Sequence, residues 1–274
     1  MKIAATHLVL VSVLGCQSNS TNIDADGTDI NICDDNSWCS SDNSKVISIA
    51  DVFFGKAEKL DQEVHDFGND EITKSLAVSR PITVMISNEE QGSVWLKKIE
   101  VSLSAMQEVK NCQGGAGGYK VVTHYKVRLK NDMDIPATLA VEHPSFKIAG
   151  NEIEGFNIFI GREEAWAGSY PWLYRLRIIL HDHKGNKVVS KPLVIATTES
   201  LVEEAIAHQR TAQDANSVFW YTGENELDLR NEALECFAEE GRRIENFAKG
   251  AMDVSPGVEK MIDEFKDPTY FSFE

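Results

Sequence analysis

Between about Arg80 and Thr198, apolar and polar residues alternate, and this period of two constrains the fold more than any other feature of the chain. In YKVVTHYKVRLK, residues 119–130, even positions carry mainly basic side chains and odd positions do not. In WLYRLRIIL, residues 172–180, one face would hold Trp172, Tyr174, Leu176, Ile178 and Leu180, and the other Arg175 and Arg177. Because successive side chains of a strand point to opposite faces of a sheet, both segments are predicted to be half-buried antiparallel strands.

Further apolar runs bring the set to about seven short strands. They cover residues 82–87, 94–103, 137–141, 156–160 and 187–196. The residues HKGN, 183–186, predict a tight hairpin turn before the last run. We therefore expect an α+β protein whose residues 45–198 form an antiparallel β-sandwich, with an immunoglobulin-like sandwich as one candidate form.

A short helix is expected ahead of the strands. Ser48, with Asp51 three residues later, fits a helix cap. Apolar residues then recur at mostly three- and four-residue spacing, at Ile49, Val52, Phe53, Leu60, Val64 and Phe67. Gly55 weakens this helix, because glycine is a poor helix former.

After Thr198 the period changes to that of helices, and residues 199–274 are predicted to form a C-terminal helical segment. The first helix begins at Ser200, which forms a capping box with Glu203. The second runs from about Asn225 to Ala248, and the third begins at Ser255 with Pro256 as its first helical residue. Each helix has one apolar stripe, so the segment is expected to pack on the sandwich.

The first residues indicate export. An apolar run from about Ile3 to Leu14 follows Lys2 and is shorter than the roughly 20 residues of a membrane span. The residues Val13-Leu14-Gly15-Cys16 resemble the bacterial lipobox, which implies that residues 1–15 are a signal peptide and that Cys16 is lipidated. Gln17 in the next position implies an outer-membrane location rather than inner-membrane retention. The alternative is an ordinary cleaved signal that contains a cysteine.

Export also makes disulfides available to the remaining cysteines, Cys33, Cys39, Cys112 and Cys236. We favour Cys33 with Cys39, since near neighbours close easily, and Cys112 with Cys236, which would tie two distant regions. The long link is worth about 4.9 kcal/mol in the loop-entropy model. The alternative is that the buried pair stays reduced as small apolar residues.

The formal net charge of −16 argues against nucleic acid as a partner, because the chain would repel a phosphate backbone. It argues equally against a broad electrostatic contact with an anionic membrane, which leaves the lipid anchor as the expected membrane link. The apolar fraction of 42% is sufficient for a core.

Residues 16–44 are rich in Asn, Ser and Asp and predict a flexible acidic tether. Within it, Asp24 and Asp26 precede Gly27 as in the first half of a calcium loop, but Cys33 stands where an EF-hand needs glutamate. Asp24, Asp26 and Asp29 also resemble the acidic pattern of thrombospondin type 3 repeats, which implies weak calcium binding. A solvated tether without a ligand is the alternative.

Signals for catalysis are weak. His181 and His183 could offer two imidazoles to zinc, with His124 as a third ligand, and a hairpin corner at His181-Asp182-His183 is the alternative. The glycine-rich residues 112–120 lack the lysine and hydroxyl of a P-loop, so a flexible loop is expected. No nucleophile has the flanking residues that activation requires. The sequence therefore predicts no enzyme, no cofactor beyond calcium and no small-molecule substrate.

Two groups of residues are candidates for partner contact. Trp166 and Tyr170 lie in an aromatic cluster with Trp172 and Tyr174, whose alternative role is in the core. The second group consists of basic residues that would form one face of a sheet if the strands that carry them are neighbours. Such a face would bind an acidic partner or the protein's own helices. The alternative is an ordinary solvated face. The basic residues are Lys120, Lys126, Arg128, Lys130, Arg175 and Arg177.

These features together predict a lipid-anchored envelope protein that acts by binding. It would be an assembly or accessory component for an envelope protein partner or polymer. One alternative is an immunity or inhibitor lipoprotein against an exported toxin or hydrolase, since the acidity would suit a basic target. The other is a metal-dependent hydrolase that uses the histidines.

Overall fold

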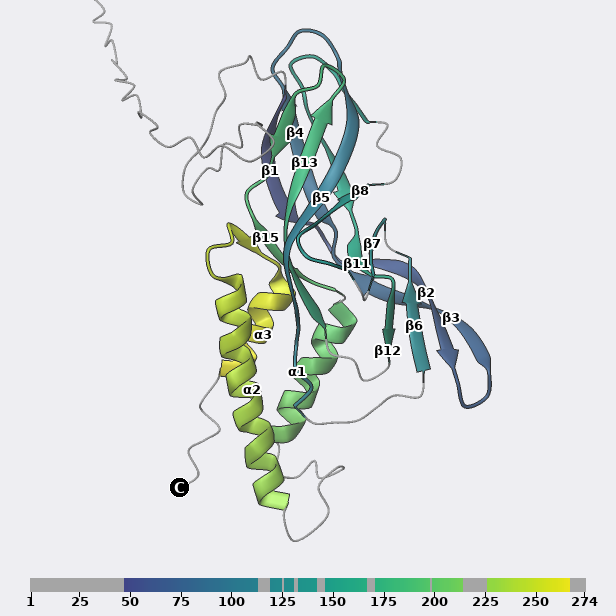
Figure 1. The fold of residues 1–274 in the computed structure, drawn as a ribbon, viewed down its shortest axis with the longest axis vertical. Helices are drawn as coiled ribbons and strands as arrows, with labels where there is room; N and C mark the ends of the chain where they lie inside the picture. The colour runs from purple at the N-terminus through teal and green to yellow at the C-terminus, as the bar shows by residue number, and fades with distance from the viewer. Residues whose placement is uncertain are drawn as a thin grey trace, which may run out of the picture. The chain divides into compact units, whose positions relative to one another are not determined.

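The computed structural model describes residues 47–112, 119–124, 126–130, 133–141, 146–166, 171–197, 199–213 and 226–266. These residues belong to one compact unit, 44–274. The fold is mixed α+β, with mostly antiparallel sheets and a group of helices near the C-terminal end of the chain (Figure 1).

The bounds of the elements are as follows. The strands are β1 (Ile47–Phe54), β2 (Glu58–Asp66), β3 (Glu71–Ser79), β4 (Ile82–Asn88), β5 (Val94–Glu108), β6 (Tyr119–Thr123), β7 (Val127–Leu129), β8 (Ala137–Ala140), β9 (Phe146–Ile148), β10 (Ile153–Ile158), β11 (Ile160–Arg162), β12 (Glu164–Trp166), β13 (Trp172–Asp182), β14 (Lys187–Val189), β15 (Leu193–Ala196) and β16 (Asp253–Val254). The helices are α1 (Glu199–Gln213), α2 (Glu226–Ala248) and α3 (Pro256–Lys266).

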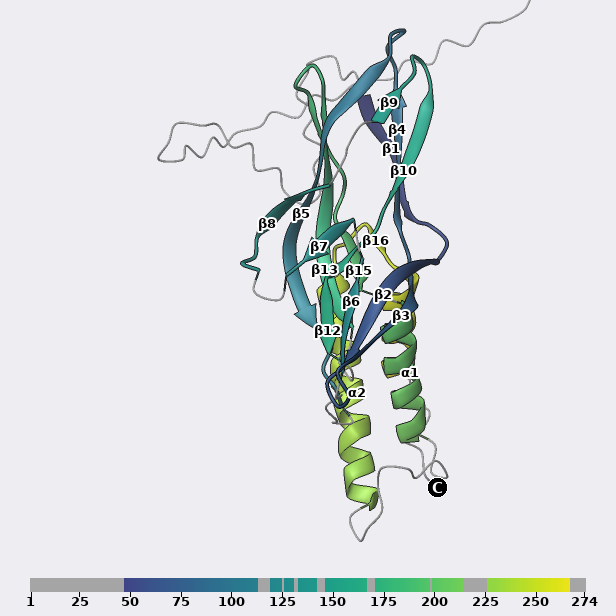
Figure 2. The same ribbon diagram turned by 90° about the vertical axis from the view of Figure 1, so that its right-hand side faces the viewer.

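The first core lies between two sheets. One has the order β16-β15-β13-β5-β8, with β14 and β9 attached to β13 and β5, and the other has the order β1-β4-β10. Figure 2 shows these strands as two layers. Alternate residues of both layers meet in one apolar cluster, which includes Ile82, Val84 and Ile86 of β4, Val101 and Leu103 of β5, and Tyr174, Leu176, Ile178 and Leu180 of β13. The inward face predicted for residues 172–180 is confirmed, since those four β13 side chains are fully buried.

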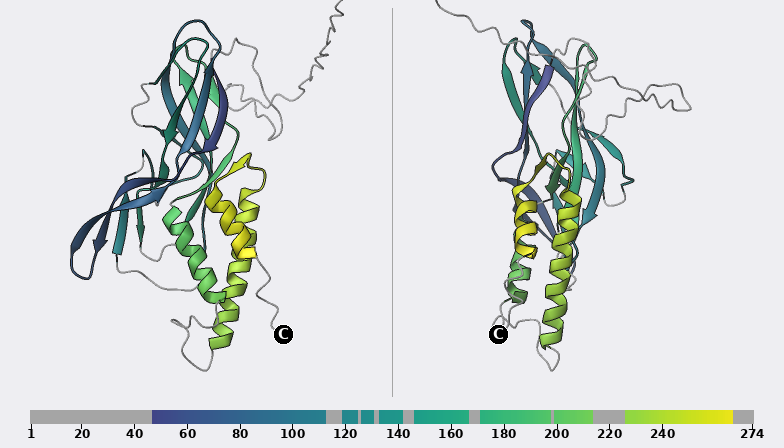
Figure 3. Two further views of the ribbon diagram at one scale, coloured as in Figure 1. Left: turned by 180° about the vertical axis from the view of Figure 1, so that it is seen from behind. Right: turned by 90° about the vertical axis from the view of Figure 1, so that its left-hand side faces the viewer.

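A second core forms where the helices cover the other face of β13 and β15. Leu173 and Val194 project from these strands into a cluster with apolar residues of all three helices. The helical contributors include Val202 and Ile206 of α1, Phe237 and Ile244 of α2, and Met261 and Phe265 of α3. The helices lie side by side in both views of Figure 3, coloured green to yellow. The strand β13 therefore contributes to both cores, one through each of its faces.

Two contacts fix α2 to the sheet. Arg175 of β13 donates hydrogen bonds to the carbonyl oxygens of Phe247 and Lys249, at 3.2 and 2.9 Å. These carbonyls lie at the C-terminal end of α2, where backbone acceptors lack helical partners and a cation is favoured. Gly250 follows in the left-handed region, with φ of +76°, and ends the helix as glycine commonly does.

The second contact is a disulfide between Cys112, just after β5, and Cys236 of α2, with a Cα–Cα distance of 5.6 Å. This is the pairing predicted from the sequence. It links residues 124 positions apart in the chain. It therefore joins the end of the central strand β5 to the helical layer.

The predicted helix over residues 48–67 is wrong, because these residues form β1 and β2. The strand β1 pairs with β4 from Ile47 opposite Asn88 to Phe54 opposite Ile82. Pairing with β4 supplies a full ladder of backbone hydrogen bonds, and β-branched residues such as Ile49 and Val52 pack well on a pleated surface. Tertiary pairing therefore overrides the helical spacing.

Three predicted strands are interrupted. The segment 156–160 is divided between β10, which ends at Ile158, and β11, which begins at Ile160. Residues 119–130 form β6 and β7, which belong to different sheets: β6 pairs with β2 and β12, and β7 pairs in parallel with β11. Residues 187–196 form β14 and β15, separated by a segment that contains Pro192, which has no N–H for a ladder. The three predicted helices are confirmed, although α1 begins at Glu199, one residue before the predicted cap at Ser200.

Replacing both Cys112 and Cys236 with serine is expected to lower the free energy of unfolding by about 2 to 5 kcal/mol, because the long loop they close is freed in the unfolded state. Urea unfolding of the variant and the wild type measures this difference. A thiol reductant should remove the difference between the two proteins. Equal stability under oxidising conditions would contradict the structural role of the bond.

Replacing Gly150 with alanine is expected to destabilise the protein by about 1 to 3 kcal/mol, the usual effect of overpacking. A Cβ atom at this position would lie 2.0 Å from the backbone oxygen of Gln91, in the loop between β4 and β5. Gly92, in the same loop, is the matched control, since a Cβ there meets nothing within 4 Å. Thermal unfolding should show a lowered Tm for Gly150→Ala and not for Gly92→Ala, and equal shifts would reject the close approach.

Candidate partner-binding surface

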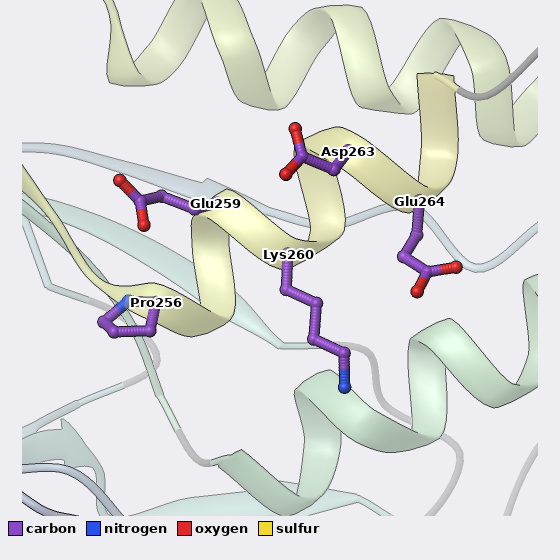
Figure 4. A pocket seen from close by; sticks show the side chains of 5 residues that line it. All are labelled: Pro256, Glu259, Lys260, Asp263 and Glu264. Carbon is purple, nitrogen blue, oxygen red and sulfur yellow. The ribbon is translucent and has the colours of Figure 1, made fainter.

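A pocket of about 500 Å³ lies along α3 on its side towards α1. Its lining is polar and consists of Pro256, Glu259, Lys260, Asp263 and Glu264 (Figure 4). Lys260 Nζ lies 2.6 Å from Glu203 Oε1 of α1, and Arg210 Nε of α1 lies 3.1 Å from Glu264 Oε2. Two of the lining charges are thus used in ion pairs that join α3 to α1, and all five lining residues belong to α3.

His181 and Asp182 are the last residues of β13, and His183 begins the predicted tight turn, residues 183–186, that leads to β14. The buried Asp182 carboxylate accepts hydrogen bonds from the backbone N–H groups of Lys184 and Asn186, at 2.9 and 2.8 Å. His183 Nδ1 accepts one from the N–H of Trp95 at 3.3 Å. His181 instead contacts Glu100, with 2.6 Å between Nε2 and Oε2. The three side chains are therefore held by strand and turn contacts of their own.

The third predicted zinc ligand, His124, is exposed just after β6. Among the residues that the structure describes, no three His, Cys, Asp or Glu side chains gather as a metal-binding group. The metal-site hypothesis for these histidines gains no geometric support.

Glu100 is the centre of a small ionic cluster on the outer face of the β5–β13 pair. Lys98 Nζ lies 2.5 Å from Glu100 Oε1, on the opposite carboxylate oxygen from His181. The hydrogen bond from Lys98, helped by His181, holds the pKa of Glu100 below its ordinary value against the opposing effect of burial. The cluster links the neighbouring strands, because Lys98 and Glu100 belong to β5 and His181 to β13.

The predicted basic face required the strands that carry it to be neighbours, and they are not. Neither β6 nor β7 lies beside β13, which is flanked by β5 and by β14 and β15. Lys120 belongs to β6, Lys126, Arg128 and Lys130 lie in or beside β7, and Arg175 and Arg177 belong to β13. Arg128 pairs with Glu163 at 3.1 Å, and Lys126 reaches the carbonyl oxygen of Asn157 at 3.4 Å. Arg175 contacts the protein's own helix α2, which is one of the two roles predicted for this face.

The aromatic cluster is divided. Tyr174 is fully buried and Trp172 is half-buried against the first core, where the Arg162 guanidinium lies 4.3 Å from the centre of the Trp172 ring. The alternative that these two residues are core is confirmed. Trp166 lies in β12, opposite Lys120 in register. Tyr170 lies outside the described residues.

Several other predictions also fall outside the described residues. They concern the signal peptide, the lipidation of Cys16, the pairing of Cys33 with Cys39, and the calcium ligands Asp24, Asp26 and Asp29. All of these remain predictions.

A surface that the sequence did not reveal lies on the hairpin of β2 and β3, residues Glu58–Ser79, hereafter the arm. Figure 1 shows the arm extending away from the two main sheets. It carries three large apolar side chains that are more than half exposed: Phe67 at 54%, Ile72 at 57% and Leu76 at 52%. Ile72 and Leu76 lie on the same face of β3, with Lys74 between them.

The arm is fixed at both ends. At its tip, Asp66 Oδ1 accepts a hydrogen bond from the N–H of Gly68, and Asn69 Oδ1 accepts one from the N–H of Glu71, at 2.8 and 3.0 Å. At its base, the Arg80 guanidinium bonds to Glu199 of α1 and to the carbonyl oxygen of Gly55, both at 2.9 Å. The exposed side chains therefore stand on an ordered hairpin.

Sequence reasoning missed the arm because it assigned β2 to a helix. A signal was present, since Gly68-Asn69-Asp70 are typical turn residues and lie between two runs of nine residues each. The strands themselves do not alternate clearly. The exposure of Ile72 and Leu76 depends on what packs against that face of β3, which a single sequence does not encode.

The substitution Glu100→Gln is expected to remove a pH-dependent contribution to the free energy of unfolding. The folded pKa of Glu100 lies below its ordinary value of 4.5, so the cluster stabilises the fold above that pH and loses its effect as pH falls through the lowered pKa. Urea unfolding at a series of pH values measures this. The difference between wild type and Glu100→Gln should shrink as pH falls below 4.5, and a constant difference would contradict the cluster.

The pKa of Asp253 is shifted in the opposite direction to that of Glu100, so a substitution there should have the opposite pH dependence. Burial raises its pKa, the nearby Asp51 adds to this, and a hydrogen bond from the N–H of Val254 opposes it. Stability from the protonated carboxyl should therefore be lost as pH rises from the ordinary value of 3.8 through the raised pKa. Relative to wild type, Asp253→Asn should become more stable as pH rises through that window, and a gain on acidification would contradict this sign.

Comparison with known proteins gives no information on function, so the function is inferred from the chain's own residues. None of the described helices combines the length and apolar character that a membrane-spanning helix needs. Neither family models, nor curated proteins, nor solved structures give a match to the chain.

Proposed function

We propose that this protein is a binding component of the bacterial cell envelope and that the arm holds its protein partner. The observation that carries the proposal is the exposure of Phe67, Ile72 and Leu76 on one projecting hairpin. Large apolar side chains that gather on an exposed element mark interaction sites, because covering them on binding removes apolar surface from water. The ordered tip and base of the arm lower the entropy that binding must overcome.

The charge of the arm favours a basic partner. Its residues include six carboxylates and two lysines, in a chain whose net charge is −16. Complementary charge speeds encounter with a basic surface and disfavours acidic competitors. The apolar side chains would then supply the affinity, and the carboxylates the selectivity.

The remaining parts of the proposal concern scaffold and location. We infer that the two sheets around the first core form a β-sandwich, which supports the arm as a rigid platform. A lipid on Cys16 would hold the protein at the outer membrane through the acidic tether. In this proposal the protein acts by binding and not by catalysis.

The test is photo-cross-linking in the cells that naturally produce the protein, with a photoreactive residue in place of Lys74, which lies between Ile72 and Leu76 on the same face of β3. A defined protein partner should be cross-linked, and Ile72→Thr with Leu76→Thr should reduce the yield about tenfold, because two apolar anchors are lost. Threonine keeps the β propensity of the strand.

The matched control is Ile153→Thr, which removes an isoleucine of similar exposure, 60% against 57%, from β10 in another sheet. The control should cross-link as the wild type does. No protein partner at position 74, or equal loss in both variants, would reject the arm as the binding surface.

A second candidate is an inhibitor or immunity protein, which the acidity of the arm also supports. Its partner would be a basic exported toxin or hydrolase. The cross-linked partner distinguishes the two candidates, since an inhibitor would abolish the partner's activity in a mixture of the purified proteins and an assembly component would not.

A further inference from the structure

The outer edge of the arm is a long, regular strand edge. Within the described part of the chain, β3 pairs with β2 alone, and the register is continuous from Glu71 opposite Asp66 to Ser79 opposite Glu58. In an antiparallel strand, alternate residues direct their N–H and C=O groups away from a given neighbour. One edge of β3 therefore presents backbone donors and acceptors in the spacing that another strand would need.

The other described sheet edges differ from β3. The strand β1 has a bulge between Ile49 and Asp51, β8 has four residues, β9, β12 and β14 have three each, and β10 has six. Bulges and short lengths are the usual protections of sheet edges. The strand β3 has nine residues, no proline and no bulge, and all six residues of Glu71–Leu76 are exposed. Along this stretch the edge is neither short nor bulged, and its protection is limited to the charges of Glu71 and Lys74.

The side chains beside this edge define what would fit there. Ile72 and Leu76 would flank an added strand with apolar surface on one face. Asp61 and Glu63 of β2 lie on that same face in register with Leu76 and Lys74, and Asp66, Asp70 and Glu71 lie at the tip. An added segment would therefore be favoured if it had apolar or β-branched residues in its middle and lysine or arginine at its ends.

A second copy of this chain fits poorly at the same edge. Each arm has six carboxylates against two lysines, so two arms repel each other. In the antiparallel register centred on Lys74, this lysine would also meet its own copy, and like charges directly opposite are destabilising. The charge of the arm selects a basic partner of different sequence.

We propose that β3 takes up an extended basic segment of the partner protein as an added strand of its sheet. This inference rests on the proposed function, because it assumes that the arm is where the partner binds. Backbone hydrogen bonds along Glu71–Leu76 would give the pairing, and the acidic residues of the arm would choose a basic segment.

The test uses the oxidised full chain without its signal peptide and three short synthetic peptides. The first peptide alternates valine and threonine between terminal lysines. The second has glutamate for every lysine, and the third is the lysine peptide with alternate backbone amides methylated along one edge. Affinity is measured by titration, and hydrogen–deuterium exchange locates the protected amides.

The lysine peptide is expected to bind and to slow exchange within Glu71–Leu76. The glutamate and N-methylated peptides should each bind at least about tenfold more weakly, because they lose charge complementarity and backbone pairing respectively. Raising the salt concentration should weaken the lysine peptide several-fold. Ile72→Thr with Leu76→Thr should weaken it too, whereas Ile153→Thr should not.

Three results would overturn strand addition. The N-methylated peptide could bind as well as its parent, protection could fall outside β3, or β3 could be protected in a concentration-dependent manner without peptide, as pairing between two copies requires. The cross-linking result at position 74 is independent of these peptides. A partner that cross-links there while peptides leave β3 unprotected would reject strand addition and keep the proposed function.

Discussion

The structure depends on the antiparallel ladder between β5 and β13, because this pair serves both cores. Through one face it contributes Leu103, Leu176 and neighbouring residues to the core between the sheets. Through the other face, Leu173 reaches the core beneath the helices, and Arg175 binds the end of α2. The disulfide adds a covalent link from the end of β5 to α2. This pair of strands thus connects the two layers, and β15 beside it also contributes to both cores.

The arm contrasts with these cores. Elsewhere the large apolar residues of the described strands mostly pack inward, whereas Phe67, Ile72 and Leu76 stay in contact with water on a hairpin that is held at its tip and base. An ordered element that exposes apolar side chains costs stability unless something covers them. We therefore place the proposed function on the arm and not on the pocket along α3, where Lys260 and Glu264 are already ion-paired with α1.

The sequence predicted most elements correctly where one period dominated. The alternation at Tyr174, Leu176, Ile178 and Leu180 located a buried face, and Ser255 followed by Pro256 located the start of α3. It failed at β2, because EKLDQEV contains good helix formers and only the pairing with β3 and β6 makes it a strand. It failed at the basic face because the alternation of residues 119–130 continues through the point where the chain changes sheets. Neither the pairing of β2 nor the change of sheet between β6 and β7 has a local sequence signal strong enough for prediction.

The arm leaves the first core and returns to it at neighbouring positions, which affects how freely its sequence can change. Phe54 and Ile82 are paired across β1 and β4, and the N–H of Gly55 bonds to the carbonyl oxygen of Pro81 at 2.9 Å. The whole arm is therefore an excursion that starts and finishes at adjacent points of one sheet. An insertion of this kind can be lengthened, recoded or exchanged with little disturbance of the ladder between β1 and β4. The surface that we propose for recognition can therefore diverge while the two cores stay constant.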